Sequence, residues 1–315
     1  MTVRLSVVTS LYKSAEFVGE FYRRAADAAA RLTPDWEIVM VNDGSPDNSL
    51  ERAIELHRRD PRVRIVDLSR NFGHHKALMT GLLHSRGDIV FLIDADLEED
   101  PAWLSTFYEA MQATRADVIY GVQRSRKGGW LERATGAFFY GIFNKLLTFP
   151  FPRNVVTARL MTRRYVNALV QHQDREINLA GLWVITGFDQ RALDVNKGKR
   201  GGSSYGMRRR ISVFVNAITS FSNRPLLYIF QLGICVILIS IVAGLVLVYK
   251  SFTGGIGVPG WASIMVSIWF LGGVTIFCVG VLGIYLAKVF TETKNRPYTV
   301  VRHVYEPAED SSGER

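Results

Sequence analysis

Residues 88–101 read DIVFLIDADLEEDP, and this stretch decides the predicted fold. A short apolar run, Asp88–Ile93, is followed at once by the carboxylates of Asp94, Asp96 and Glu98. Short apolar runs rich in β-branched and aromatic residues are typical of buried strands. We therefore predict a buried strand whose carboxyl end leads into an acidic loop.

Four further apolar runs resemble Asp88–Ile93, and they alternate with helical patterns along the first half of the chain. We predict strands at these runs: Leu5–Ser10, Trp36–Val41, Val63–Leu68 and Asp117–Val122. The helices are predicted at Ala15–Leu32, Asp47–Arg59, Lys76–Ser85 and Pro101–Thr114. This alternation predicts an α/β fold with a mostly parallel sheet, in which ligands bind beyond the carboxyl ends of the strands. Tyr12, Asp43 and the acidic loop all follow predicted strands.

The last third of the chain is strongly apolar. Residues 226–249 and 262–287 carry no formal charge, and each run is long enough to cross a bilayer. We predict a domain over residues 1–225, a two-helix transmembrane hairpin within 226–290, and a polar tail over 291–315. Several basic residues precede the first run and follow the second, whereas the connector between the runs carries only one charge, Lys250. The positive-inside rule therefore predicts that both termini are cytoplasmic.

The net charge is +9 and the pI is near 9.6, which favours anionic lipids and phosphates as ligands. No zinc-finger or RNA-binding motif is present, so nucleic acid is not an expected partner. The N-terminus lacks the pattern of a secretory signal, which agrees with a cytoplasmic domain.

Gly129–Phe151 has an apolar face and basic charges, which predicts an interfacial helix lying on the membrane, with a buried core helix as the alternative.

The acidic loop is the first candidate site. Asp94, Asp96 and Glu98 offer the hard oxygen ligands that Mg²⁺ or Mn²⁺ prefers, and such sites leave positions open for substrate phosphates. The alternative is a set of solvated loop acids. Asp43 could accept a hydrogen bond from a nucleobase, while its neighbours Ser45 and Asp47 could cap the next helix; the two roles are compatible.

Basic residues follow other predicted strands. Lys76 could face a phosphate, whereas a metal site at His74 and His75 is not favoured because adjacent side chains rarely converge. Arg124 and Arg126, beside two glycines, form a plausible phosphate-binding loop, with a solvated charged loop as the alternative. A second such loop, residues 197–210, contains Arg200 and Tyr205.

Five segments together carry a resemblance to a known family. They are VNDGSPDNS (41–49), LSRNFGHHKA (68–77), IDADLEEDP (93–101), RSRKGG (124–129) and ARLMTRR (158–164). The chain resembles the family 2 inverting glycosyltransferases of GT-A fold, in the branch that contains dolichol-phosphate mannose synthase and the bacterial polyprenyl-phosphate glycosyltransferases. The resemblance covers about residues 4–290.

The resemblance implies a nucleotide-diphosphate sugar as donor, with a UDP-sugar preferred, and a polyprenyl phosphate such as undecaprenyl phosphate as acceptor. It also implies an integral protein of the bacterial inner membrane that serves lipopolysaccharide or cell-wall glycan modification and can form a homo-oligomer. The resemblance implies that Asp43 contacts the nucleobase and Asp94 lies near the donor ribose, and that Asp96 and Glu98 bind Mg²⁺ or Mn²⁺. It also implies that Arg124 and Arg126 bind the acceptor phosphate, with Arg159 nearby. Beside these roles we expect Tyr12 and Lys76 to bind the nucleotide, and Arg200 and Tyr205 to serve the acceptor phosphate. Asp94, Asp96, Arg124, Arg126 and Arg159 are the expected catalytic set.

The chain departs from the family pattern at Thr157, where an aspartate is expected before Arg-Leu. A sugar hydroxyl needs a general base, but a phosphate monoester is mostly dianionic at neutral pH and is already a nucleophile. The missing aspartate therefore fits a lipid-phosphate acceptor. Two alternatives stay open: transfer to a glycan or glycolipid hydroxyl, and a non-catalytic scaffold partner in a glycan-modification complex.

Overall fold

The computed structural model describes residues 4–123, 154–175, 177–197, 219, 222, 224–253 and 260–307. Within these residues one eight-stranded sheet has the order β7-β5-β6-β4-β1-β2-β3-β8. Residues 296–307 belong to the same compact unit as this sheet, whereas the helices that precede them form a second unit. The two units are described separately below.

All five predicted strands are present, and no strand end differs from its prediction by more than one residue. They are β1 (Leu5–Leu11), β2 (Trp36–Asn42), β3 (Val63–Leu68), β4 (Ile89–Leu92) and β5 (Val118–Gln123). Strand β1 pairs in parallel with β2 and β4, and β2 pairs in parallel with β3. The predicted mostly parallel α/β sheet is confirmed, and the strands β1 to β4 share one carboxyl edge.

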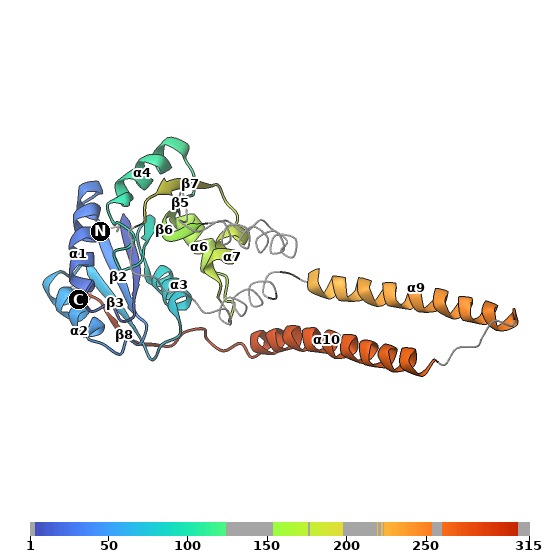
Figure 1. Cartoon of the computed structure of the whole chain (residues 1–315). Coiled ribbons are helices and arrows are strands. Elements are labelled where there is room, and N and C mark those ends of the chain that lie inside the picture. The colour runs from blue at the N-terminus through green and yellow to red at the C-terminus, as the bar shows by residue number, and fades with distance from the viewer. Residues whose placement is uncertain are drawn as a thin grey trace, which may run out of the picture. The chain divides into compact units, whose positions relative to one another are not determined.

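The predicted helices cover both faces of the sheet (Figure 1). Helix α1 (Val18–Leu32) packs against α2 (Ser49–Arg59) and α4 (Trp103–Thr114). Helix α3 (His74–His84) lies on the other side of β1 and β2 and packs against α6 (Arg163–Leu169). A further short helix, α7, spans Leu179–Ile185. Because both faces are covered, the side chains of β1 to β3 are almost all buried.

Three strands were not predicted from the sequence. Strand β6 (Val155–Thr162) inserts between β4 and β5 and is antiparallel to both. Strand β7 (Gln190–Val195) pairs in parallel with β5. Strand β8 (Val301–Tyr305) comes from the end of the chain and pairs antiparallel with β3. Residues 301–305 of the predicted tail are therefore an edge strand of the sheet.

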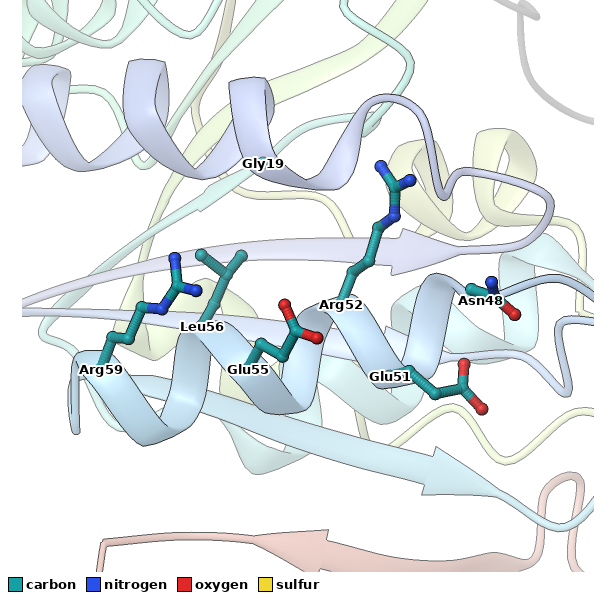
Figure 2. Close-up of a pocket in the computed structure, with 7 residues that line it drawn as sticks. All are labelled: Gly19, Asn48, Glu51, Arg52, Glu55, Leu56 and Arg59. Atoms are coloured by element: carbon teal, nitrogen blue, oxygen red, sulfur yellow. The ribbon is translucent and has the colours of Figure 1, made fainter.

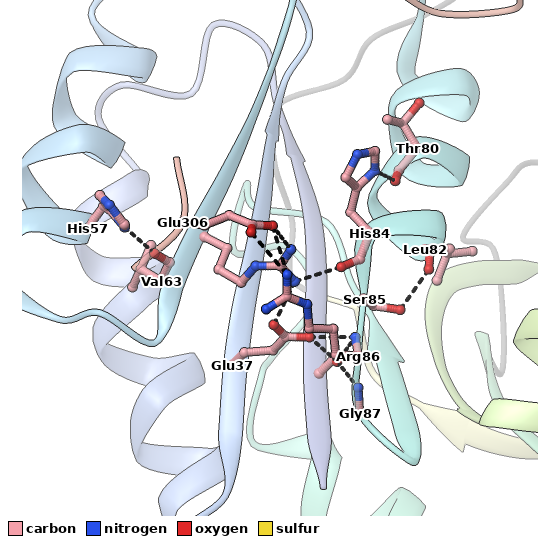
Figure 3. A network of polar contacts seen from close by, with 12 residues as sticks. Glu37, His57, Val63, Thr80, Leu82, His84, Ser85, Arg86, Gly87 and Glu306 are labelled. Carbon is pink, nitrogen blue, oxygen red and sulfur yellow. Dashed lines mark hydrogen bonds and ion pairs between the residues drawn. The ribbon is translucent and has the colours of Figure 1, made fainter. Parts of the chain in front are cut away.

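Four charged residues tie β8 to the opposite, amino edge of the parallel strands (Figure 3). Glu306 forms ion pairs with Arg64 and, at 3.0 Å, with Arg86. The Arg64 guanidinium is almost fully buried and also donates to Glu37 Oε2 at 2.9 Å. We call Glu37, Arg64, Arg86 and Glu306 the Glu306 network; it pairs buried charges that would be costly if left alone.

The second unit contains two long helices, α9 (Arg224–Phe252) and α10 (Trp261–Thr293), which contact each other. The Tyr285 hydroxyl donates to the carbonyl oxygen of Ser222 at 2.6 Å. Ser267–Thr293 is, within the described part of the chain, the one segment long and apolar enough to cross a membrane by length and composition. Apolar side chains such as Trp269 and Ile276 are exposed on α10. The two-span hairpin and the division into domains stay predictions, and the predicted interfacial helix at 129–151 lies outside the described residues.

Candidate functional site at the carboxyl edge of the sheet

The segment Asp94–Asp100, which we call the acid loop, leaves the sheet just after β4. Leu97, at its centre, has a φ of 62°, in the left-handed region that bulky side chains rarely adopt. Backbone strain of this kind is frequent at functional sites. The loop is therefore held in a specific conformation rather than being a free surface turn.

Asp94 is held by two residues from other elements. The Thr157 hydroxyl of β6 donates to Asp94 Oδ2 at 2.9 Å, and His74 Nε2 lies 3.3 Å from Asp94 Oδ1. The other ring nitrogen of His74 is 2.9 Å from the Ser10 hydroxyl at the end of β1. Burial of Asp94 opposes its ionisation, but the bonds from His74 and Thr157 outweigh it and hold the pKa of Asp94 below its ordinary value.

Asp96 and Glu98 lie on the same loop, and the Glu98 N–H donates to Asp96 Oδ1 at 3.0 Å. Burial, together with the negative charges of Asp94 and Glu98, raises the pKa of Asp96. Glu98 Oε2 lies 3.2 Å from the Lys197 ammonium, which comes from just beyond β7. A bound cation would offset the negative charges that raise the pKa of Asp96.

Glu99 is a site residue that the sequence analysis missed. Its side chain is fully buried, and its Oε1 accepts a hydrogen bond from the Thr157 N–H at 2.9 Å. Its Oε2 has no hydrogen-bond partner among the described residues. Burial and the charge of Asp94 raise the pKa of Glu99 to about 7. Thr157 thus contacts two of the acids at once, through its hydroxyl and through its backbone.

The carboxylate oxygens of the acid loop are the type of ligand that a hard divalent cation prefers. Mg²⁺ is commonly held by one or two carboxylates with substrate phosphates completing its coordination. Asp96 and Glu98 offer two such carboxylates, whereas no group of three or more His, Cys, Asp or Glu side chains converges in the part of the chain that the structure describes. The residues present would thus suit a cation that arrives with a phosphate-bearing donor.

Asp43 follows β2 and is buried against the next loop of the carboxyl edge. Its two carboxylate oxygens accept hydrogen bonds from the backbone N–H groups of Phe72 and Gly73, at 2.7 and 3.0 Å. Burial raises the pKa of Asp43, although these two bonds oppose the rise. Gly44 has a φ of 57°, and a Cβ there would lie 2.4 Å from the backbone of Arg70 and Asn71. Asp43 and Gly44 together fix the spacing of two loops at the site.

Tyr12 and Lys76 lie at the same edge. Tyr12, just after β1, is 45% exposed, and the turn that follows it is held by the Lys13 N–H donating to Ser45 Oγ at 2.7 Å. The carboxylate of Asp47 accepts from Ser49 and from the backbone N–H of Ala15. Lys76 lies in the first turn of α3, two residues after His74. Nucleotide binding by Tyr12, Asp43 and Lys76 stays a prediction.

Arg159 differs from the other predicted site residues because it is only 1% exposed. Its guanidinium stacks on the Trp183 ring, and its Nε donates weakly to the Thr157 carbonyl oxygen at 3.4 Å. Burial lowers the pKa of Arg159 to about 9, and Nη2 has no hydrogen-bond partner within the described residues. Arg159 lies on the strand of Thr157, but a role with the acceptor phosphate stays a prediction. Arg124, Arg126, Arg200 and Tyr205 lie outside the described residues.

A pocket of about 570 Å³ lies elsewhere, between α1 and α2 (Figure 2). Its lining residues include Arg52, Glu55 and Arg59 of α2, with Gly19 of α1 on the other side. None of the predicted site residues lines it. The chemistry of the acid loop therefore identifies the candidate site better than this pocket does.

Comparisons with known proteins identify the family of the chain. Residues 6–170 match the glycosyl transferase family 2 model. A glycosyltransferase of Mycobacterium tuberculosis is 53% identical over 304 residues, covering 96% of this chain and 89% of the relative. The SfII prophage-derived bactoprenol glucosyl transferase of Shigella flexneri is 31% identical over 303 residues, covering 95% of this chain and 98% of the relative.

A solved structure, S. aureus TarS 1–349 in complex with UDP-GlcNAc, matches with a TM-score of 0.46 and 16% identity, covering 69% of this chain and 66% of that one. The matched family segment contains strands β1 to β6, except the first residue of β1, and the acid loop. The mostly parallel α/β sheet agrees with the GT-A fold that the sequence motifs implied. The chain belongs to glycosyl transferase family 2.

Proposed function

We propose that this protein transfers a sugar from a nucleotide-diphosphate sugar, preferentially a UDP-sugar, to a polyprenyl phosphate such as undecaprenyl phosphate. The product is a polyprenyl-monophosphate sugar, formed with inversion at the anomeric carbon. The observation that carries the proposal is the acid loop at the carboxyl edge of the sheet, in a chain similar over nearly its whole length to a relative named as a bactoprenol glucosyl transferase.

The donor is expected to lie along the carboxyl edge, from Asp43 to the acid loop. Asp43 is oriented by the backbone of residues 72–73, and Asp94 is oriented by His74 and Thr157. Both carboxylates are thus fixed before the donor binds, so less ordering is required when it does. Asp96 and Glu98 would hold Mg²⁺ or Mn²⁺, which when bound supplies positive charge next to the diphosphate.

The residue at position 157 fits an acceptor that is already ionised. The hydroxyl and the N–H of Thr157 both donate hydrogen bonds to acids of the loop. A threonine hydroxyl is not a general base at neutral pH. A phosphate monoester brings its own nucleophilic oxygen. The task left to the protein is to orient the acceptor phosphate and screen its charge, which we assign to Arg124 and Arg126, with Arg159, Arg200 and Tyr205.

We also propose that both α9 and α10 cross the bacterial inner membrane, with the sheet and both termini on the cytoplasmic side. Strands β3 and β8 pair in one sheet, and α9 and α10 lie between them in the chain. A single crossing would leave β3 and β8 on opposite sides of the membrane. An even number of crossings keeps them together, so the apolar length of α10 argues that α9 crosses as well.

The function is tested with purified full-length protein in detergent, polyprenyl phosphate and a panel of radiolabelled nucleotide sugars. We expect a chloroform-soluble labelled product with at least one UDP-sugar in the presence of Mg²⁺ or Mn²⁺. Asp96→Asn removes a predicted cation ligand with almost no change in size, and it should abolish the product. Asp27→Asn, an exposed position on α1, is the matched control.

The absence of labelled lipid with every donor would refute the proposal. Label found in a polymer or in a glycolipid would support a hydroxyl acceptor instead. Equal activity of Asp96→Asn and the unmodified protein would remove the assigned role of the acid loop. If no donor nucleotide bound at all, as measured by calorimetry, a non-catalytic scaffold would become the better description.

A further inference from the structure

The acid loop concentrates negative charge that the protein must balance when no donor is bound. Asp94, Asp96, Glu98 and Glu99 lie within six residues, and Glu99 is fully buried. Carboxylates that are crowded and partly removed from water repel one another unless a cation lies near. A resting protein with this loop therefore needs a positive group of its own.

Lys197 supplies that group from a distant part of the chain. Its Nζ lies 3.2 Å from Glu98 Oε2 and 3.5 Å from Glu99 Oε1, and its side chain is only 23% exposed. Both distances exceed the 2.7–2.9 Å that is usual for a tight charged hydrogen bond, about 2.8 Å on average. The ammonium is thus shared between two acids rather than committed to either one.

Glu98 connects Lys197 to the expected cation site. The oxygen nearest the ammonium belongs to a residue that we assign to the divalent cation. Two positive groups cannot share this carboxylate without strong repulsion, because like charges a few ångströms apart in a partly buried site interact strongly. The cation and the Lys197 ammonium therefore compete for Glu98.

We propose that Lys197 is an internal counter-cation of the acid loop, which holds Glu98 and Glu99 in the donor-free protein and is displaced when a divalent cation and a nucleotide diphosphate bind. The displaced ammonium becomes available to the diphosphate, so one positive charge moves from the acids to the donor. The inference rests on the proposed function for the identity of the donor. Lys197 is a positioning residue in this scheme, since it acts through the acids.

The proposal is tested by measuring Mn²⁺ binding to the full-length protein in detergent without nucleotide, from the free Mn²⁺ signal in electron paramagnetic resonance. Lys197→Met keeps the length of the side chain and removes its charge, so the competitor for Glu98 is lost. We expect Lys197→Met to bind Mn²⁺ roughly tenfold more tightly, the change that one charged hydrogen bond is worth. Addition of UDP should reduce this difference, because UDP displaces the ammonium in the unmodified protein.

Two further variants make the result specific. Lys197→Arg retains a cation and should keep the weak Mn²⁺ binding of the unmodified protein. Arg191→Met, a loss of positive charge on the neighbouring strand β7, should leave Mn²⁺ affinity unchanged because Arg191 pairs with Asp189 instead. A thermal unfolding curve for each variant identifies any that fails to fold, and Lys197→Gln then replaces Lys197→Met.

Equal or weaker Mn²⁺ binding by Lys197→Met would overturn the proposal. So would a failure of every variant to bind Mn²⁺ with or without UDP, because no cation would then compete with Lys197. The labelled-lipid assay is read separately. Absence of product with a clear affinity difference would refute the proposed function alone, whereas product formation without the affinity difference would refute only the role of Lys197.

Discussion

Thr157 shows how a single residue can organise this site. Its hydroxyl binds Asp94 and its N–H binds Glu99, so one strand residue holds two acids that would otherwise repel each other. The same strand offers a matched comparison at Thr162, whose hydroxyl binds Asp117 at 3.0 Å, away from the acid loop. Both side chains make one bond from a hydroxyl to a carboxylate.

Thr157→Val should reduce kcat/KM for the nucleotide sugar by roughly tenfold or more, since a hydrogen bond to a charged group contributes about 1.5–3 kcal/mol. The reason is that Asp94 loses a partner while the shape of the side chain is kept. Thr162→Val should lower the melting temperature about as much as Thr157→Val does, because each variant loses one bond from a hydroxyl to a carboxylate. It should leave kcat/KM unchanged. Equal loss of kcat/KM in both variants would show that the effect of Thr157→Val is only structural.

Gly44 is a second residue at which a single substitution should have a clear effect, here on stability. Its positive φ and its close approach to Arg70 and Asn71 leave no room for a methyl group. Gly44→Ala should destabilise the protein by at least about 1–3 kcal/mol from the backbone conformation alone. Gly19→Ala is the control, because nothing lies within 4 Å of a Cβ there and alanine is the better helix former. Thermal unfolding of both variants provides the measurement, and an unchanged melting temperature for Gly44→Ala would contradict the geometry.

The site was only partly predictable from the sequence. Asp94, Asp96 and Glu98 were identified because they follow a strand in a recognisable motif. Glu99 was missed because a fourth acid in a row looks like one more solvated charge. The partners His74, Thr157 and Lys197 come from other elements, up to about a hundred residues away, and no local pattern reveals such contacts.

Among the elements, strand β8 is the least expected. It follows two long apolar helices, yet it completes the edge of the sheet beside β3. The five strands predicted from hydrophobic runs formed as expected, because each is rich in apolar residues and mostly buried. Strands β6, β7 and β8 carry mixed patterns, as edge or antiparallel strands do, and their pairing depends on contacts distant in sequence.

The Glu306 network predicts how stability depends on pH. The hydrogen bond from Arg64 holds the pKa of Glu306 below its ordinary value, which is about 4.3. A lowered folded pKa adds stability above the ordinary value, and this stability is lost as the pH falls through the folded pKa. At pH 7, Glu306→Gln should therefore lower the melting temperature by roughly 2–4 °C, the effect of about 1 kcal/mol in a domain of this size.

The difference between Glu306→Gln and the unmodified protein should shrink as the pH is lowered below about 4. Glu51→Gln, at an exposed position on α2, should show no comparable difference at any pH. A constant gap for Glu306→Gln between pH 7 and pH 3 would mean that the charge of Glu306 is not what stabilises the strand.

At the scale of the whole molecule, the sheet constrains the path of the chain through a membrane. If α9 and α10 both cross, the connection between them faces away from the cytoplasm. Thr253→Cys, at the end of α9, should then react with a membrane-impermeant maleimide added outside intact spheroplasts, in a background where Cys235 and Cys278 are serine. Asp27→Cys on α1 should react only after the cells are permeabilised. Labelling of both cysteines from one side would exclude the two-crossing arrangement.

Strand β8 also affects the order in which the protein can be made. The ribosome synthesises β3 early and β8 only after both apolar helices have left the exit tunnel. The edge of β3 that pairs with β8 therefore stays unpaired during the synthesis of more than half the chain. Arg64 lacks its partner Glu306 for the same time. An unpaired edge strand invites association with other chains. If α9 and α10 enter the membrane as proposed, their timely insertion would protect the sheet, and a failure of insertion would first cause misfolding of the sheet rather than of the helices.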